Sequence, residues 1–275
     1  MYKVLIPTDG SDNAKHALKY ALNLLEGREV EFVLFQSFDV PVSTTDMPVS
    51  FDSLGHEELN NLLEKDAEGL RKSYVNSNFS FSTRVEIGSF SFNVNALVDE
   101  LAIDLIVMGT KGASGLAAVV IGSNTADVIQ IVSCTVIAVP YEAEIAVPKH
   151  ILFASDNKGF STVDVIQPMI DIAKQFGSHI HLMNVLDEGK STSIDEAIAG
   201  LKLDQLLEEI DHTFHFEDGK DKSQAIENYL NSHEIDLLAV VPRKNNFFDA
   251  IFHKSVTRKL ALHTKVPLLA MHDLG

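Results

Sequence analysis

The sequence has a single cysteine, Cys134, and far fewer basic than acidic side chains. One cysteine cannot form an intrachain disulfide, as is usual for proteins of the reducing cytoplasm. Lys and Arg number 22 against 39 Asp and Glu, so the formal net charge is −17. Such a charge repels nucleic-acid phosphates and anionic membrane surfaces at long range. The composition predicts a cytoplasmic protein that binds neither nucleic acid nor membranes.

Long apolar runs and several common motifs are also missing. No stretch of about 18 apolar residues could span a bilayer, and residues 1–7 enter a strand directly, without the apolar core of a signal peptide. The patterns Gly-x4-Gly-Lys-Ser/Thr and Gly-x-Gly-x2-Gly are absent, which disfavours P-loop ATPases and dinucleotide-dependent dehydrogenases. Residues 112–115 only partly match the hydrolase motif Gly-x-Ser-x-Gly.

What is present is an alternation of apolar strands and amphipathic helices. A chain of 275 residues predicts about two domains. Continuous apolar runs separated by helical stripes are typical of an α/β fold with a parallel sheet covered on both faces. The strands expected in the first half are residues 3–6, 30–35, 79–87, 105–108 and 135–139.

The same pattern occurs twice along the chain. Residues 149–156 echo residues 2–9, and residues 266–271 echo residues 134–139. Residues 142–148 read as a linker between the copies. The sequence predicts two tandem domains, 1–141 and 147–275, each a five-stranded parallel-sheet sandwich with a Rossmann-like arrangement.

A glycine-rich segment between an expected strand and an expected helix is the strongest chemical signal. Its spacing is Gly-x2-Gly-x9-Gly-Ser, from Gly109 to Ser123. Glycines allow close backbone approach and positive φ, and a helix N-terminus favours phosphate. If the first and fourth strands are neighbours, this segment and the turn Pro7-Thr8-Asp9 flank one crevice. The pattern indicates a phosphate-binding site, although a bare structural turn is the alternative.

These motifs together resemble the universal stress protein family over essentially the whole chain. The resemblance implies an adenine nucleotide alpha hydrolase-like fold that binds ATP, with any Mg²⁺ held through the phosphates. Residues expected near the base and the ribose are Pro7, Thr8, Asp9, Ser37, Phe38, Met108 and Gly109. Residues expected near the phosphates are Lys111, Gly112, Gly122, Ser123, Asn124 and Thr125.

The second copy departs from the motif. Matching the final strands places Val241 at Gly109 and Lys254 at Gly122, and a lysine also replaces Gly112. We expect no nucleotide in the second half, including at Asp156. The family also pairs its last strands across a dimer interface, so residues 136–139 are expected to pair with 268–271 in an internal pseudo-dimer. A homodimer of the whole chain is compatible with this arrangement.

Two functions remain open. One is an ATP-binding stress or regulatory protein, at most a slow ATPase, because no general base stands out beside the phosphates. The other is an interaction module whose pseudo-dimer binds partner proteins or a small apolar ligand.

Individual residues also have two interpretations. Asp9 suits either a ribose contact or a helix cap, and Cys134 either a redox thiol or a small apolar residue. Four histidines suit either zinc or an ordinary surface: His179, His181, His212 and His215.

Overall fold

The computed structural model describes residues 1–38, 51–110, 122–155, 162–186, 194–218, 222–242 and 265–273. The first half alternates strands and helices as the apolar runs predict. Its elements are β1 (Tyr2–Pro7), α1 (Asp12–Leu24), β2 (Val30–Phe38), α2 (Phe51–Ser73), β3 (Phe79–Ile87), α3 (Phe90–Leu101), β4 (Leu105–Gly109), α4 (Ser123–Ile131) and β5 (Thr135–Val139).

The second half repeats this order. Its described elements are β6 (His150–Ser155), the 3₁₀-helix η1 (Val163–Ile166), α5 (Gln167–Phe176), β7 (His179–Leu186), α6 (Ile194–Leu206), β8 (His212–Asp218), α7 (Lys222–Ser232), β9 (Leu237–Val240) and β10 (Leu268–Ala270). Gly177 ends α5 in the left-handed conformation that glycine adopts without steric cost.

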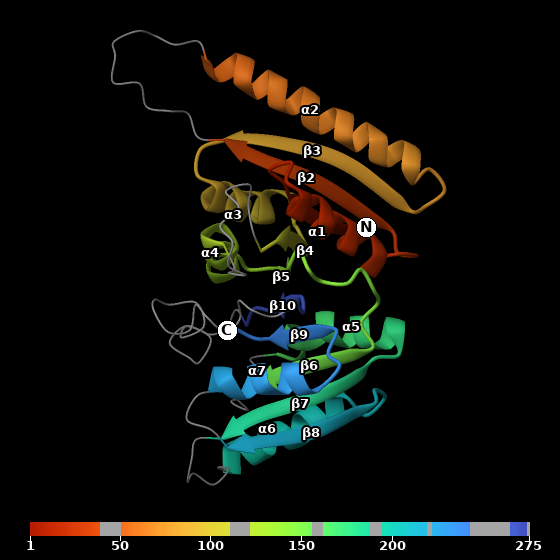
Figure 1. Ribbon diagram of the computed structural model, residues 1–275, viewed down its shortest axis with the longest axis vertical. Coiled ribbons are helices and arrows are strands. Elements are labelled where there is room, and N and C mark those ends of the chain that lie inside the picture. The colour runs from red at the N-terminus through yellow and green to blue at the C-terminus, as the bar shows by residue number, and fades with distance from the viewer. Residues whose placement is uncertain are drawn as a thin grey trace, which may run out of the picture.

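The ten strands within the described ranges form one sheet, in the order β3-β2-β1-β4-β5-β10-β9-β6-β7-β8 (Figure 1). Pairing within each half is parallel. β1 lies between β2 and β4, so the first and fourth strands are neighbours, which is the condition for the two loops to flank one crevice. Strand order reverses at β1, because β2 and β3 are added on one side of β1 and β4 and β5 on its opposite side. Such a reversal is where open α/β sheets bind ligands.

The two halves join through one antiparallel strand pair. Leu269 of β10 lies opposite Ile137 of β5, and Leu268 and Ala270 lie opposite Ala138 and Val136. Ile137 and Leu269 are completely buried. The pairing predicted between the last strands is therefore present, and it removes two edges that would otherwise expose unpaired backbone groups.

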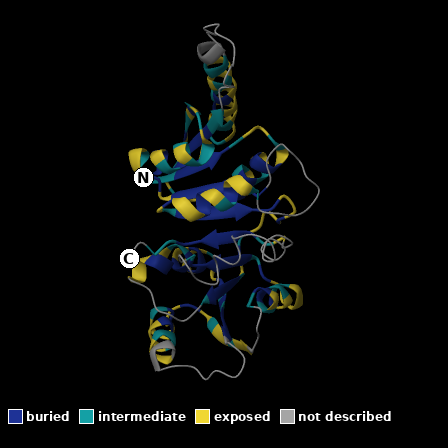
Figure 2. Cartoon of the chain, turned by 90° about the vertical axis from the view of Figure 1, so that its left-hand side faces the viewer, coloured by how far each residue is buried: buried dark blue, intermediate teal, exposed yellow. Residues whose placement is uncertain are grey.

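Helices cover both faces of the sheet and enclose two apolar layers. One layer packs α1, α2, α5 and α6 against the sheet, and the other packs α3, α4 and α7. Figure 2 shows the strands buried between helices whose outer surfaces are exposed. Each of these helices buries one stripe of side chains, as amphipathic periodicity predicts. No helix among the described residues is long and apolar enough to cross a bilayer.

Side-chain hydrogen bonds add to the strand junction. The imidazole of His272, just after β10, donates from Nε2 to the carbonyl of Ile129 in α4 over 2.6 Å. Burial lowers the pKa of His272, although backbone hydrogen bonds oppose this. Arg28 Nε donates to Gln175 Oε1 over 2.6 Å. The two halves are thus tied at helix ends as well as at the sheet.

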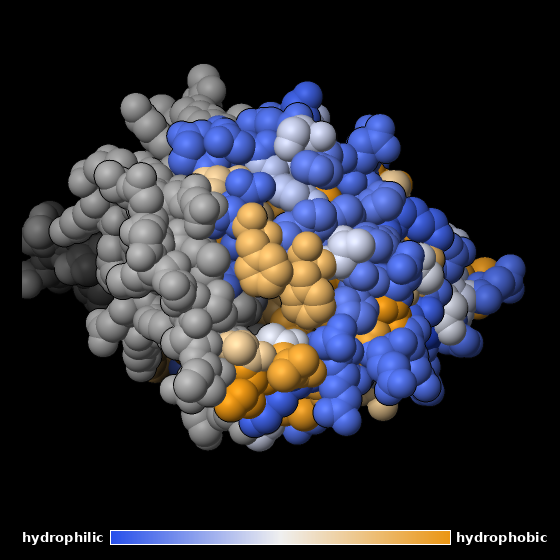
Figure 3. Space-filling model, turned by 90° about the horizontal axis from the view of Figure 1, so that it is seen from below, coloured by the Kyte–Doolittle hydropathy of each residue, from blue (hydrophilic) through white to orange (hydrophobic). Residues whose placement is uncertain are grey.

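The outer edges of the sheet differ between the halves. In the first half α2 lies along β3, and Phe81 is buried. In the second half Phe214 and Phe216 of the edge strand β8 stack on each other with their ring centroids 6.4 Å apart, and Phe216 is 58% exposed. Figure 3 looks at this end of the molecule, where apolar side chains gather amid a mostly hydrophilic surface. The shorter α6 leaves these rings partly uncovered.

Truncating the junction should destabilise the protein strongly. We expect Leu269→Ala to lower the free energy of unfolding by about 2–5 kcal/mol, because it leaves a cavity at the centre of the sheet. Urea denaturation followed by circular dichroism measures this. Leu201→Ala is the matched control, because Leu201 is 70% exposed, and its effect should stay within about 0.5 kcal/mol. Equal effects of the two substitutions would contradict a buried junction.

Cys134 should be unreactive in the native protein. Burial, with nearby Asp104 and Asp99 adding a smaller effect, raises the pKa of its thiol to about 12. The nucleophilic thiolate is then nearly absent at neutral pH, which favours the structural interpretation over a redox role. We expect a disulfide reagent to react on the order of a hundredfold more slowly with native protein than with urea-unfolded protein. Comparable rates would restore the redox interpretation.

Candidate functional site

The candidate site lies where β1 and β4 end at the same edge of the sheet. These neighbouring strands are parallel, so the residues that follow them emerge side by side. The turn after β1 contains Thr8 and Asp9, and the segment after β4 begins with Thr110. The predicted base and ribose residues from these two segments, Pro7, Thr8, Asp9, Met108 and Gly109, therefore come together.

Hydrogen bonds hold the first turn in shape. The N–H of Thr8 donates to the carbonyl of Phe35 on β2 over 2.8 Å. Asp9 Oδ1 accepts from the N–H of Ser11 over 3.0 Å. Ser11 then caps α1 by accepting from the N–H of Ala14. Asp9 is exposed and shapes the turn that leads into the helix, so its local structural role does not prevent a ligand contact.

Hydrogen bonds hold the two ends of the glycine-rich segment together. The N–H of Gly122 donates to the carbonyl of Thr110 over 2.6 Å, and the N–H of Thr110 donates to Val139. Thr125 Oγ1 donates to the carbonyl of Gly109 over 3.0 Å. These bonds fix where α4 begins relative to β4. The predicted phosphate residues Lys111 and Gly112 lie outside the described residues.

Of the two properties that glycine could provide in this motif, the structure uses close approach and not positive φ. Gly122 has φ −58°, and Gly109 is not among the glycines with positive φ. A Cβ at Gly109 would lie 2.6 Å from Asn13 Nδ2, and one at Gly122 would lie 3.2 Å from the Thr110 carbonyl oxygen. Both glycines therefore permit close approach within the protein, at the strand end and at the helix start.

Asn13 is a site residue that sequence reasoning missed. Its side chain, on the first turn of α1, is buried against Gly109 and so connects the two loops. The sequence offers one indication of this role, its polar side chain, because an asparagine beside the apolar stripe of α1 needs polar neighbours. Nothing in the spacing indicated which strand end it would contact.

The start of α4 presents backbone donors. Gly122 is the N-cap, and Ser123 and Asn124 are exposed, whereas Thr125 is buried. The first-turn N–H groups of an α-helix have no partner inside the helix and carry partial positive charge. This end of α4 can therefore accept an anion.

Ser37 and Phe38 end β2, next to β1. The carbonyl of Phe38 accepts from the N–H of Gly88 over 2.9 Å, and its ring lies 6.4 Å from that of His56, centroid to centroid. His56 Nε2 donates to the carbonyl of Val85. The Phe38 ring is half-buried and borders the same edge of the sheet as the two loops.

The corresponding edge of the second half is only partly described. Val241, aligned with Gly109, is buried just after β9. Asp156 and Lys254 lie outside the described residues. Among the described residues, no group of three or more His, Cys, Asp or Glu side chains is placed to hold a metal ion. The zinc interpretation of the four histidines therefore gains no support.

Comparison with known proteins agrees with this architecture. A universal stress protein of Methanocaldococcus jannaschii is 31% identical over 142 residues, covering 50% of this chain and 81% of that protein. A second from the same organism is 26% identical over 145 residues, covering 47% of this chain and 90% of that protein. The crystal structure of a universal stress protein from Archaeoglobus fulgidus superposes with a TM-score of 0.71. It covers 98% of this chain and 96% of its own at 16% identity, which indicates a shared fold.

The family model matches in two places. It describes the universal stress protein family and matches residues 1–140 and again residues 148–272. Both copies of the strand-and-helix unit are therefore recognised separately, in agreement with the repeat seen in the sequence and in the sheet. The chain belongs to the universal stress protein family, as a member with two tandem copies of the family's unit.

Proposed function

We propose that the first half of the chain binds ATP at the edge of the sheet formed by β1 and β4, in a protein with a stress-related role. The observation that carries this proposal is that hydrogen bonds hold the two ends of the glycine-rich segment together. The Gly122–Thr110 and Thr125–Gly109 hydrogen bonds bring the N-terminus of α4 beside the end of β4. A phosphate group at that point would meet the first-turn N–H groups and the hydroxyl of Ser123.

The nucleoside end would lie toward β1 and β2. Asp9 is an exposed carboxylate on a turn fixed by Ser11, and it would accept a hydrogen bond from a ribose hydroxyl. Pro7 and Met108 would border the adenine, with Ser37 or Phe38 as a wall. Mg²⁺ would bind through the phosphates, and Lys111 and Gly112 would complete the phosphate side.

The proposal places one nucleotide in each chain and the chain in the cytoplasm. The second copy replaces glycine by Val241 and Lys254, and side chains at these positions would block the close backbone approach that glycine allows. A single working site is also compatible with slow hydrolysis or none, because no general base is assigned. The pseudo-dimer of the two halves is internal, and a homodimer of whole chains would be a further association.

Isothermal titration tests the site directly. ATP·Mg²⁺ is titrated into protein from which any co-purified nucleotide has been removed. We expect a stoichiometry near one per chain. A stoichiometry near two would overturn the assignment of a nonfunctional second site. Absence of heat, with no nucleotide released on denaturation, would favour the interaction-module alternative.

A matched pair of substitutions tests the ribose contact. Asp9→Asn keeps an oxygen that can accept from the N–H of Ser11 and removes the charge. We expect it to weaken ATP binding by roughly tenfold or more, the effect of losing a charged hydrogen bond. Asp156→Asn, at the aligned position of the second half, should bind ATP as the wild type does. The assignment fails if the two variants behave alike.

The glycine at the start of α4 offers a second test. In Gly122→Val the Cβ would lie 3.2 Å from the Thr110 carbonyl oxygen, and its branches would enter the proposed phosphate space. We expect ATP binding to be lost while circular dichroism shows a folded protein. Gly200→Val in α6 is the control, because a Cβ there meets nothing within 4 Å. Wild-type affinity in Gly122→Val would rule out the phosphate site.

A further inference from the structure

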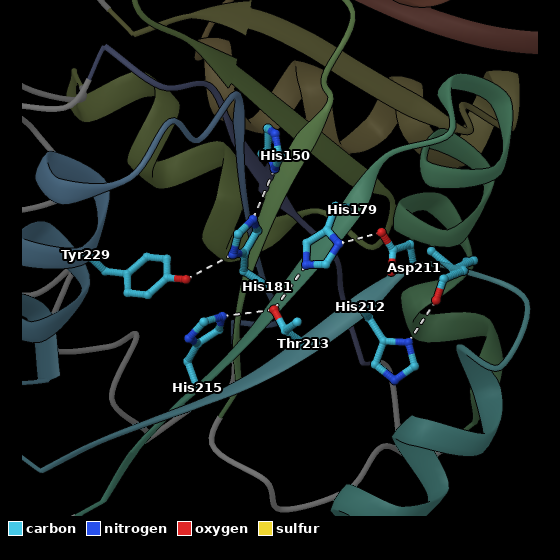
Figure 4. A network of polar contacts seen from close by, with 9 residues as sticks. His150, His179, His181, Asp211, His212, Thr213, His215 and Tyr229 are labelled. Carbon is cyan, nitrogen blue, oxygen red and sulfur yellow. Dashed lines mark hydrogen bonds and ion pairs between the residues drawn. The ribbon is translucent and has the colours of Figure 1, made fainter.

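The second half contains a cluster of histidines between the sheet and α7, remote from the proposed nucleotide site. We define the histidine cluster as His150, His179, His181, His215 and His233. The first four come from three adjacent strands, β6, β7 and β8, and His233 directly follows α7. Figure 4 shows the imidazoles of the strand histidines converging, with Tyr229 of α7 reaching in from the side.

His181 lies at the centre of the cluster. Its Nε2 is 3.2 Å from Nδ1 of His150, and its Nδ1 is 2.9 Å from the hydroxyl of Tyr229. The ring centroids of His179 and His215 lie 4.7 Å and 5.5 Å away. His150 and His181 share one hydrogen between two facing nitrogens, so the pair has room for one added proton but not for two.

A second chain of hydrogen bonds runs through Thr213. Asp211 Oδ2 accepts from His179 Nδ1 over 2.9 Å, which leaves His179 Nε2 as an acceptor in the neutral ring. Nε2 of His179 lies 3.0 Å from Thr213 Oγ1, and Nε2 of His215 lies 2.9 Å from the same oxygen. The threonine hydroxyl therefore donates to His179 and accepts from His215. This arrangement requires a neutral His179, because its Nε2 must accept from the threonine hydroxyl.

α7 is held against these histidines by aromatic contacts. Tyr229 stacks on His233 with a centroid separation of 3.9 Å and an interplanar angle of 8°. Its ring lies 5.0 Å from that of His215. Tyr229 is buried, and Ile226, one turn earlier, packs in the same apolar layer. Tyr229 of α7 thus contacts the sheet through His181 and His215, two side chains whose charge changes with pH.

The carboxylates near the cluster contact its rim or the backbone, and none of them offsets the loss of hydration at the central imidazole of His181. Asp211 pairs with His179 at its rim, and Glu217 of β8 acts on His215 and Tyr229. Asp236 accepts from the backbone N–H groups of Lys149 and His150.

Desolvation and then the neighbouring histidines lower the pKa of His181 to about 4. Desolvation followed by His233 and His179 also lowers the pKa of His215.

The first half provides an internal comparison. Lys3 pairs with Glu31 in the sheet as His150 pairs with His179, and Val33 pairs with Ser82 as His181 pairs with Thr213. The central histidine is therefore replaced by valine, and Glu31 accepts a hydrogen bond from Ser82 Oγ over 3.0 Å. α3 covers this face with Val94, Leu97 and Val98. No histidine occupies the corresponding positions Lys3, Glu31, Val33 and Ser82.

We propose that the second half is an acid-responsive module, in which protonation of the histidine cluster loosens α7 from the sheet while the first half keeps its packing. After protonation, several positively charged imidazoles would lie at the short ring separations given above and would repel one another. A positive His179 would break the Thr213 chain of hydrogen bonds, because its Nε2 could no longer accept from the threonine hydroxyl. The inference does not depend on nucleotide binding in the first half.

The direction of the pH effect follows from His181. Its pKa in the folded protein, about 4, is below the value of about 6.5 for an unfolded histidine. The unfolded state therefore binds more protons between these values. The stabilising contribution is fully present above about pH 6.5 and is lost as the pH falls toward about 4.

Hydrogen exchange on the full-length protein tests the proposal. The protection of α7, residues 222–232, is compared with that of α3, residues 90–101, in the same samples. Between about pH 7.5 and about pH 5 we expect the protection of α7 to fall about tenfold relative to α3, from proton uptake by the opened state. Constant protection of α7 relative to α3 across this range would overturn the proposal.

Two variants show whether the cluster is responsible. His181→Val introduces the residue found at the aligned position of the first half and should remove most of the pH response of α7. His212→Gln is the control, on the neighbouring strand β8, because His212 contacts Asp204 of α6 and not the cluster; its pH response should match the wild type. A full response in His181→Val would contradict the proposal.

A measurement on the wild type keeps the test decisive if His181→Val does not fold. Nuclear magnetic resonance titration of the imidazole Cε1–H signals gives each histidine's pKa directly. We expect His181 to titrate below about pH 5, well under the ordinary histidine value. An ordinary pKa for His181 would show that the folded state accepts the proton without cost, and the mechanism would fail.

Discussion

Everything in this molecule depends on one antiparallel contact, the pairing of β5 with β10. Each half ends in a short apolar strand that would be an exposed edge on its own, and each provides the other with a partner. The contact places Ile137 and Leu269 at the centre of a ten-stranded sheet. It also sets α4 against the second half, where His272 binds the carbonyl of Ile129. The helix whose start forms the candidate phosphate site is therefore held at its other end by the second half.

The duplicated framework supports different chemistry in its two copies. In the first, polar residues and glycines gather at the carboxyl end of the strands, where backbone donors and an exposed carboxylate suit a nucleotide. In the second, titratable side chains gather on a face of the sheet, beneath α7. Both features use positions that parallel strands bring together. The strand frame itself is the same, as shown by Asp104 and Asp236, which accept from the backbone at the start of β1 and β6 respectively.

Sequence patterns predicted the frame well because apolar runs and helical stripes directly reflect burial. The runs ending at Met108 and Val139 became central strands. The echo between residues 134–139 and 266–271 showed the two final strands, and the family resemblance implied that they pair. Contacts between elements were harder to predict from the sequence. Nothing in the spacing showed that Asn13 fills the space beside Gly109, or that Gly122 avoids a carbonyl. The sequence singles out His179, His181 and His215 among four histidines. His150, Tyr229 and His233 join them only through register and helix placement, which local periodicity does not contain.

The covalent link between the halves has an evolutionary consequence. In a dimer of identical chains, every mutation at the interface appears on both sides, so a change favourable on one side is imposed on the other. Here β5 and β10 are encoded separately, and their sequences already differ. A substitution can therefore improve one half for its task without altering its counterpart. Fusion of the two copies frees the strand junction from symmetry, so that each half can change independently of the other.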